Sequence, residues 1–206
     1  MLASSTIIED IDAMQKAGLA SLAFFYCDFR EEEKTDLRGL LSSLLAQLCY
    51  QSDRYCDILS KFYSDHAKGL RRPSDASLVK CLKDLLNLSG LAPVYIIVDA
   101  LDECPNTSTT SVRSSRADVL NLLTEVINSR IPNLRICVTS RPEADIKKVL
   151  DSLIPCRVSL HDETGQKRDI EEYIQSVINT HPKNGSWKDE HKQLVIDVLT
   201  EKAGGM

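Results

Sequence analysis

The sequence lacks the residue patterns of a zinc site. Its seven cysteines contain no C-x-x-C pair, and its four histidines show no ligand spacing. Several cysteines fall within apolar stretches, where a free thiol behaves as a small hydrophobic side chain. This usage of cysteine predicts a protein of a reducing, intracellular compartment, and we expect a cytoplasmic location.

The sequence also lacks an excess of basic residues and a long apolar run. Its 25 Lys and Arg against 30 Asp and Glu give a formal net charge of −5, which argues against a protein that binds nucleic acid through a basic face. No apolar run approaches the roughly 18–20 residues of a membrane-spanning helix, and the N-terminus shows no basic segment of a secretory signal. We therefore expect neither nucleic acid nor a membrane as a partner.

The 206 residues, 43% of them hydrophobic and 27% charged, are typical of a soluble globular domain with the possible start of a second. Short apolar stretches alternate with segments of helical periodicity, which predicts an α/β fold with a mostly parallel sheet flanked by helices. The predicted strands are 18–27, 94–98, 134–138 and 156–160. The predicted helices are 4–16, 37–48, 53–65, 75–86, 116–130, 143–150, 166–179 and 187–202.

Start signals precede three of these helices. Thr35 or Asp36 is expected to cap the helix over 37–48, because its side chain can accept a hydrogen bond from the first helical turn. Ser74 or Asp75 is expected to do the same for the helix that ends at residue 86. Pro142 is expected at the first helical position of the segment 143–150.

The stretch VYIIVDALDEC, residues 94–104, ends a buried strand in three acids. In parallel sheets ligands bind at the carboxyl ends of the strands, and Mg²⁺ prefers one or two carboxylates together with phosphate oxygens and water. We predict Asp99 as a metal ligand, and Glu103 or its neighbour Asp102 as the group that orients or deprotonates a water attacking a phosphoryl group. The alternative is that Asp99 caps the next turn and that Asp102 and Glu103 are only solvated.

The stretch LRICVTSRPE, residues 134–143, also ends in polar groups. If its strand lies beside the acidic one, Arg141 reaches the same edge of the sheet as Asp99. A guanidinium has forked donors that suit a γ-phosphate, so Thr139, Ser140 and Arg141 are predicted to bind the nucleotide. The alternative is that Thr139 and Ser140 cap the following helix and that Arg141 is a surface charge.

Together these two stretches resemble the Walker B and sensor-1 segments of NACHT-type signalling NTPases of the STAND class, in particular the fungal set with nephrocystin-3-like N-terminal domains. Residues 19–48 and the stretch RDIEEYI at 168–174 resemble the same family. The resemblance implies a P-loop NTPase fold that binds Mg²⁺ with ATP or GTP. It also implies a nucleotide-dependent oligomerisation switch that acts through self-association or protein partners.

The family's Walker A loop, G-x-x-x-x-G-K-[ST], is absent, and the sequence contains no Gly-Lys pair. The resemblance then implies a partial NACHT core over 1–180, cut at both ends, with the start of a helical extension over 181–206. It implies an empty strand position beside the strand 134–138, with unpaired edges. We expect poor nucleotide affinity, which argues against hydrolysis by this chain alone.

Two other classes of function stay open at this stage. The first is a non-catalytic interaction scaffold that keeps the shape of the sheet without binding nucleotide. The second is a metal-dependent nuclease built on Asp99 and Glu103. This second class is the weaker, because no further inward acids and no Lys or His on neighbouring strands accompany the two carboxylates.

Overall fold

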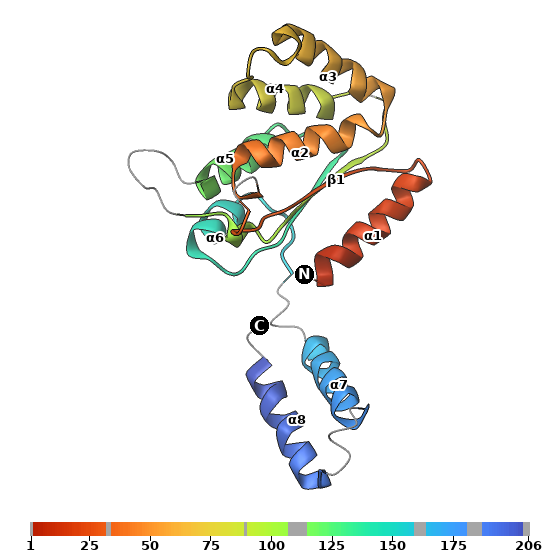
Figure 1. The fold of residues 1–206 in the computed structure, drawn as a ribbon, viewed down its shortest axis with the longest axis vertical. Coiled ribbons are helices and arrows are strands. Elements are labelled where there is room, and N and C mark those ends of the chain that lie inside the picture. The colour runs from red at the N-terminus through yellow and green to blue at the C-terminus, as the bar shows by residue number, and fades with distance from the viewer. Residues whose placement is uncertain are drawn as a thin grey trace. The chain divides into compact units, whose positions relative to one another are not determined.

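The computed structural model describes residues 2–31, 34–88, 90–106, 115–158, 164–180 and 187–203. The chain divides into two compact units, Met1–Leu153 and Ile154–Met206. The first unit holds the sheet and most of the helices, and the second holds α7 (Thr164–Thr180) and α8 (Asp189–Ala203) (Figure 1). The boundary predicted at residue 180 concerns the organisation of the family and stays a prediction.

Three strands form the sheet in the described residues, and each pair is parallel. They are β1 (Ser21–Tyr26), β2 (Val94–Asp99) and β3 (Leu134–Val138), in the order β1-β2-β3. The strand β2 lies in the middle and is almost wholly buried, as its unbroken apolar sequence predicts. The α/β fold with a parallel sheet flanked by helices is therefore confirmed.

The two faces of the sheet are covered by different helices. On one face, Ile11 of α1 (Leu2–Lys16) packs against Leu22 and Ile97. Ala23 and Val98 alternate with those residues along their strands, so they lie on the other face, where both are fully buried. The helix α2 (Leu37–Cys49) packs against β1 (Figure 1). It presents five leucines to this core, namely Leu40, Leu41, Leu44, Leu45 and Leu48. The core thus fills both sides of β2, which holds the carboxyl end of that strand in place.

The predicted helices of the first half of the chain are present with caps of the expected kind. Asp36 is the N-cap of α2, and its Oδ1 accepts a hydrogen bond of 2.7 Å from the backbone N–H of Gly39. Ser74 caps α4 (Asp75–Leu86) by accepting from the N–H of Ser77. Between them lies α3 (Asp53–Asp65), which the short helix η2 (Ala67–Gly69) follows.

Two predicted elements are wrong in detail. The helix α6 (Ala144–Leu150) begins after Glu143, which is its extended N-cap, so Pro142 is not at the first helical position. The N–H of Glu143 donates to the carbonyl of Arg141 at 2.8 Å, and this tight turn around Pro142 takes the place of a first helical turn. The predicted strand 156–160 is not a strand over 156–158, and residues 159–160 lie outside the described part. Its Val158 is 66% exposed, so no core recruits this stretch.

The remaining helices agree with the predicted segments. The helix α5 (Ser115–Asn128) precedes β3 and buries Val119 on its inner face. In the second unit α7 and α8 contact each other, and they bury Ile178 and Ile196. No helix in the described ranges is long and apolar enough to cross a membrane.

The outer edge of β1 is closed by two glutamine side chains of the segment 47–51. The N–H of Phe24 donates to Gln47 Oε1 at 3.0 Å, and Gln47 Nε2 donates back to the Phe24 carbonyl at 2.7 Å. Gln51 makes the same pair of contacts with Leu22, at 2.9 and 2.5 Å. The two amides therefore imitate a neighbouring strand and block further pairing.

Replacing Gln47 with alanine leaves the N–H and C=O of Phe24 without partners in a half-buried place. We expect the free energy of unfolding to fall by about 1–2 kcal/mol and the variant to aggregate sooner, because a strand edge is opened. Urea denaturation and light scattering measure the two effects. Gln15→Ala in α1 is the matched control, since the Gln15 side chain makes no hydrogen bond to a described residue. Equal behaviour of the two variants would contradict the edge-capping role.

The opposite edge of the sheet is open in the described residues, where no strand pairs the outer side of β3. The apolar side chains of β3 are only half-buried, whereas those of β2 are buried. The sheet is therefore asymmetric, with one capped edge and one open edge.

Candidate functional site

The carboxyl ends of β2 and β3 bring Asp99 and Thr139 into contact. Asp99 is only 4% exposed. The hydroxyl of Thr139 donates to Asp99 Oδ1 at 2.6 Å and accepts from the N–H of Ala100 at 2.9 Å. Neither residue is the helix cap that the alternative interpretation required, because Ala100 precedes η3 (Leu101–Glu103) and Glu143 caps α6. The pair instead fixes a buried carboxylate at the end of the central strand.

A left-handed residue turns the chain sharply after β2. Ala100 has φ 55° and ψ 47°, a conformation that costs a non-glycine residue about 1–3 kcal/mol. The small side chain limits this cost, and the N–H of Leu101 donates to the carbonyl of Thr139 at 2.9 Å. The turn places Asp102 and Glu103 on η3, directly beyond the strand end.

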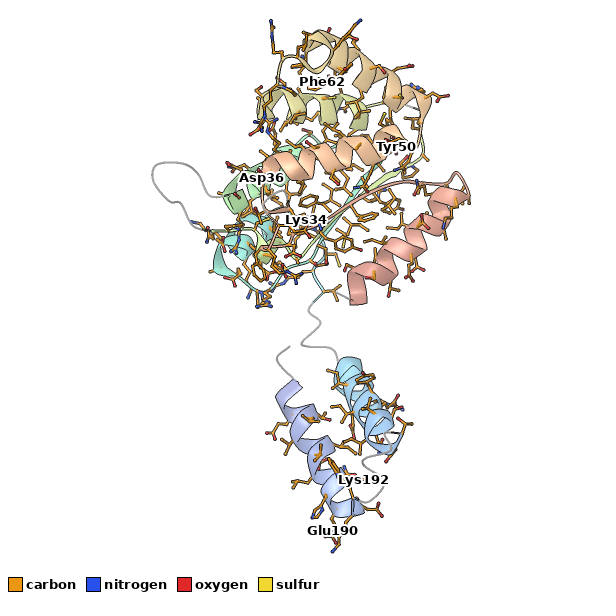
Figure 2. The ribbon with its side chains drawn as sticks, viewed as in Figure 1. Lys34, Asp36, Tyr50, Phe62, Glu190 and Lys192 are labelled. Carbon is orange, nitrogen blue, oxygen red and sulfur yellow. The ribbon has the colours of Figure 1, made fainter. Side chains whose placement is uncertain are left out.

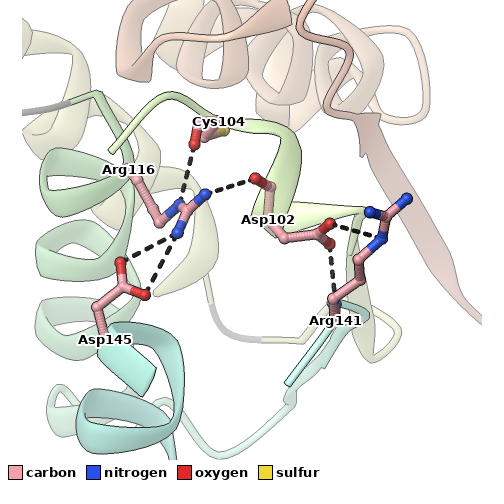
Figure 3. Close-up of polar contacts among 5 residues, drawn as sticks. All are labelled: Asp102, Cys104, Arg116, Arg141 and Asp145. Atoms are coloured by element: carbon pink, nitrogen blue, oxygen red, sulfur yellow. Dashed lines mark hydrogen bonds and ion pairs between the residues drawn. The ribbon is translucent and has the colours of Figure 1, made fainter. Parts of the chain in front are cut away.

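Asp102 and Arg141 form an ion pair across this edge. The N–H of Arg141 donates to Asp102 Oδ1 at 2.9 Å, and its Nε lies 3.4 Å from Oδ2 (Figure 3). The carboxylate is 11% exposed and the Arg141 side chain 81%. Arg141 thus lies at the edge predicted for it, but its guanidinium is engaged with Asp102.

The other predicted site residues make fewer contacts. Ser140 is exposed, and neither its hydroxyl nor the Glu103 carboxylate has a hydrogen-bond partner among the described residues. Glu103 is half-buried, and its charge acts on Arg30 in the loop after β1. The pKa of Arg30 is raised mainly by its hydrogen bond to Asp28 and by the charge of Asp28, and the negative charge of Glu103 raises it further. The same contacts lower the pKa of Asp28 to about 2.

Sequence reasoning missed a buried arginine that holds the η3 turn. Arg116 Nε donates to the Cys104 carbonyl at 2.9 Å, Nη2 donates to the Asp102 carbonyl, and Nη1 lies 3.2 Å from Asp145 Oδ2 (Figure 3). The Arg116 side chain is 9% exposed. A signal was available, because Arg116 is three and seven residues before Val119 and Leu123 and so lies on the apolar face of α5.

Three thiols surround this edge of the sheet. Interaction with the Cys104 thiol and burial raise the pKa of Cys27. Interaction with the Cys27 thiol lowers the pKa of Cys104, and the positive charge of Arg116 lowers it further. Burial and the charge of Asp99 raise the pKa of Cys137. The charge of Asp99 therefore acts on two of the three thiols, those of Cys27 and Cys137.

A basic hollow lies beside β1. It has a volume of about 690 Å³ and includes Tyr26, which is opposite Asp99 in the sheet register. Its lining contains Lys34, which Figure 2 labels beside Asp36, together with Arg38 and Arg72. Two of these cations are paired with acids, Lys34 with Glu31 and Arg38 with Asp75, so the hollow offers little unpaired positive charge to the strand end.

The donor groups suit a hard divalent cation held by few protein ligands. In the described residues no group of three or more His, Cys, Asp or Glu side chains could hold a metal ion. Mg²⁺ needs fewer, since it usually binds one or two carboxylates and completes its shell with phosphate oxygens and water. Asp99 has one oxygen engaged by Thr139 and keeps the other for such a contact.

The fold and this strand edge define an α/β protein with a polar site at the carboxyl end of a parallel sheet. The family model of the nephrocystin 3 N-terminal domain matches residues 1–141, so the chain belongs to that family. The matched range includes every predicted site residue. Comparison with curated proteins finds no match, and comparison with solved structures finds none.

Proposed function

We propose that the chain is the core of a NACHT-type NTPase domain of the STAND class, with the sheet of a P-loop NTPase. In its parent protein this domain binds ATP or GTP with Mg²⁺ and acts as a nucleotide-dependent oligomerisation switch. The observation that carries the proposal is the buried Asp99 carboxylate at the end of the central parallel strand, held by Thr139 of the next strand. Carboxyl ends of parallel strands are where such sheets bind ligands.

Each polar group at this edge has a role in the proposal. Asp99 would hold Mg²⁺, which would neutralise charge on the phosphate oxygens. Thr139 fixes the rotamer of Asp99, and Ser140 and Arg141 face the phosphates. Glu103, whose carboxylate has no partner in the described part of the chain, orients or deprotonates the attacking water, with Asp102 as its neighbour.

The ion pair of Arg141 with Asp102 gives the site two states. A γ-phosphate competes with Asp102 for the Arg141 guanidinium. The Arg141 side chain is 81% exposed and can turn toward a ligand, and the Asp102 carboxylate, which is 11% exposed, keeps the hydrogen bond from the Arg141 N–H when the guanidinium leaves. The nucleotide can therefore exchange one partner of the guanidinium for another.

A second candidate is a non-catalytic interaction scaffold. The observation in its favour is that Asp99 and Asp102 already have partners in Thr139 and Arg141. In this case the polar edge only stabilises the fold, and the open side of β3 would be the part that contacts other proteins. The two candidates differ in whether nucleotide and Mg²⁺ stabilise the chain.

A thermal-shift experiment separates them. With Mg²⁺ and ATP or GTP at about ten times Kd, linkage predicts a gain of roughly 1.4 kcal/mol and a rise in Tm of about 3–5 °C. We expect this rise for the unmodified chain and for Asp57→Asn, an exposed substitution on α3, and no rise for Asp99→Asn. Each variant is compared with itself without nucleotide. Three flat responses would favour the scaffold.

A further inference from the structure

A basic loop, residues 67–71, lies between α3 and α4. Its Leu70 is 92% exposed, and the two cations near it in the sequence, Lys68 and Arg71, are exposed as well. Neither cation has an acidic partner among the described residues. Single exposed leucines are common on protein surfaces, so this one becomes informative only through the shape of its loop.

The basic loop is held in an unusual backbone conformation. Ala67 and Lys68 both have a positive φ, of 53° and 52°, which alanine and lysine rarely adopt. The N–H of Leu70 donates to the Ala67 carbonyl at 3.2 Å, and the N–H of Arg71 donates to the His66 carbonyl at 3.1 Å. Strained backbone that its surroundings hold in place clusters at binding sites, which makes the basic loop a candidate binding surface.

An acidic groove lies beside β1 and is formed by α1, β1 and the residues that end α2. Its volume is about 520 Å³. The apolar side chains of Ile8, Leu22 and Phe24 line it, and its acids are Glu9 and Asp12. The described residues that line the groove include no Lys or Arg. The acidic groove is therefore opposite in charge to the basic loop.

Glu9 is the acid of this groove that is available to a partner. Asp12 is paired with Lys16 at 2.6 Å, whereas Glu9 is exposed and has no cationic partner in the described part of the chain. The groove thus offers an apolar lining next to an unpaired acid. The basic loop offers the complement, an apolar side chain next to unpaired cations.

The basic loop and the acidic groove of one copy cannot meet, because α3 separates them. Tyr50, which lines the groove, precedes this helix, and Phe62 lies in its last turn, just before the loop (Figure 2). A helix of 13 residues is about 20 Å long. A contact between the two surfaces therefore joins two copies of the chain head to tail.

We propose that the basic loop of one copy docks into the acidic groove of a second copy. Leu70 of the first copy packs on Ile8 and Phe24 of the second, and Arg71 pairs with Glu9. Because the two surfaces differ, each bound pair keeps one free loop and one free groove, so further copies can add. The contact does not depend on nucleotide binding, because neither surface contains a residue of the candidate site.

Sedimentation equilibrium of the full chain without nucleotide tests whether the copies associate. A loop in a groove makes a contact of small area, and such contacts are weak, so we expect the weight-average mass to rise by about half between about 10 µM and about 500 µM. A mass that stays at the monomer value over this range would overturn the proposal.

Charge reversal assigns the association to these two surfaces. Glu9→Arg and Arg71→Glu each place like charges against each other and are expected to weaken association by about tenfold or more. The chain with both substitutions has an opposite pair again, so its association should recover to within about threefold of the unmodified chain. Asp10→Arg is the matched control, because Asp10 is exposed on α1 outside the groove, and it should have no effect.

An effect of net charge alone would give a different result. Glu9→Arg makes the net charge of −5 less negative by two, which reduces repulsion between copies and would strengthen association. Association that survives Glu9→Arg, or that the double substitution fails to restore, would contradict the proposal and assign the contact to another surface, such as the open edge of β3.

Discussion

Replacing Arg116 with alanine is expected to lower the free energy of unfolding by about 3–5 kcal/mol. The guanidinium donates to the backbone carbonyls of Cys104 and Asp102 and pairs with Asp145. Without it, two carbonyls in a largely buried place lose their partners and a carboxylate loses its counter-charge. Urea denaturation followed by far-UV circular dichroism measures the change.

Arg135→Ala is the matched control for this substitution. Arg135 also donates to two backbone carbonyls, those of Pro132 and Leu134, each at 3.0 Å, but its side chain is exposed. Water can replace its contacts, so we expect a change of less than about 0.5 kcal/mol. If Arg116→Ala were as mild as Arg135→Ala, the η3 turn would not depend on the buried arginine.

Replacing Leu41 with alanine is expected to cost about 2–5 kcal/mol, because it leaves a cavity between α2 and the sheet. Leu41 is 0% exposed and is one of the five buried leucines of α2. Leu70→Ala removes the same atoms from a side chain that is 92% exposed, and it should be nearly neutral. A cost below about 1 kcal/mol for Leu41→Ala would mean that α2 is not part of a close-packed core.

The apolar pattern predicted the three strands of the described sheet, but it also predicted a strand over 156–160 whose described part, 156–158, is not a strand. The run VYIIV is apolar on both faces, which is typical of a strand buried on both sides, and β2 is such a strand. The contact of Thr139 with Asp99 was also within reach, because parallel neighbours bring equivalent ends together. The N-caps Asp36 and Ser74 could be predicted because each accepts a hydrogen bond from an N–H only three residues further along the chain.

Contacts between segments that are far apart along the chain could not be predicted from the sequence. The ion pair of Arg141 with Asp102 depends on the left-handed turn at Ala100. Alanine rarely adopts a positive φ, so the sequence does not predict this turn. The clamp of Arg116 depends on how α5 packs beside the η3 turn. Each of these is set by tertiary packing, which single-sequence patterns do not encode.

The strand end is therefore a set of polar groups that hold one another. Asp99 is held by Thr139, Asp102 by Arg141, and the backbone between them by Arg116. The three acids outnumber Arg141, so negative charge dominates the edge. Free nucleotide is repelled by such a site, and we expect binding to require Mg²⁺ and to be weak, with Kd about 1 mM.

The central claim is that Asp99 binds Mg²⁺ together with a nucleotide. Calorimetric titration of ATP into the chain, with and without Mg²⁺, tests it most directly, with Asp99→Asn and the exposed Asp57→Asn measured in parallel. The account predicts weak binding that needs Mg²⁺, that Asp57→Asn retains and that Asp99→Asn abolishes. Binding that persists in Asp99→Asn or without Mg²⁺, or no binding by the unmodified chain, would contradict it.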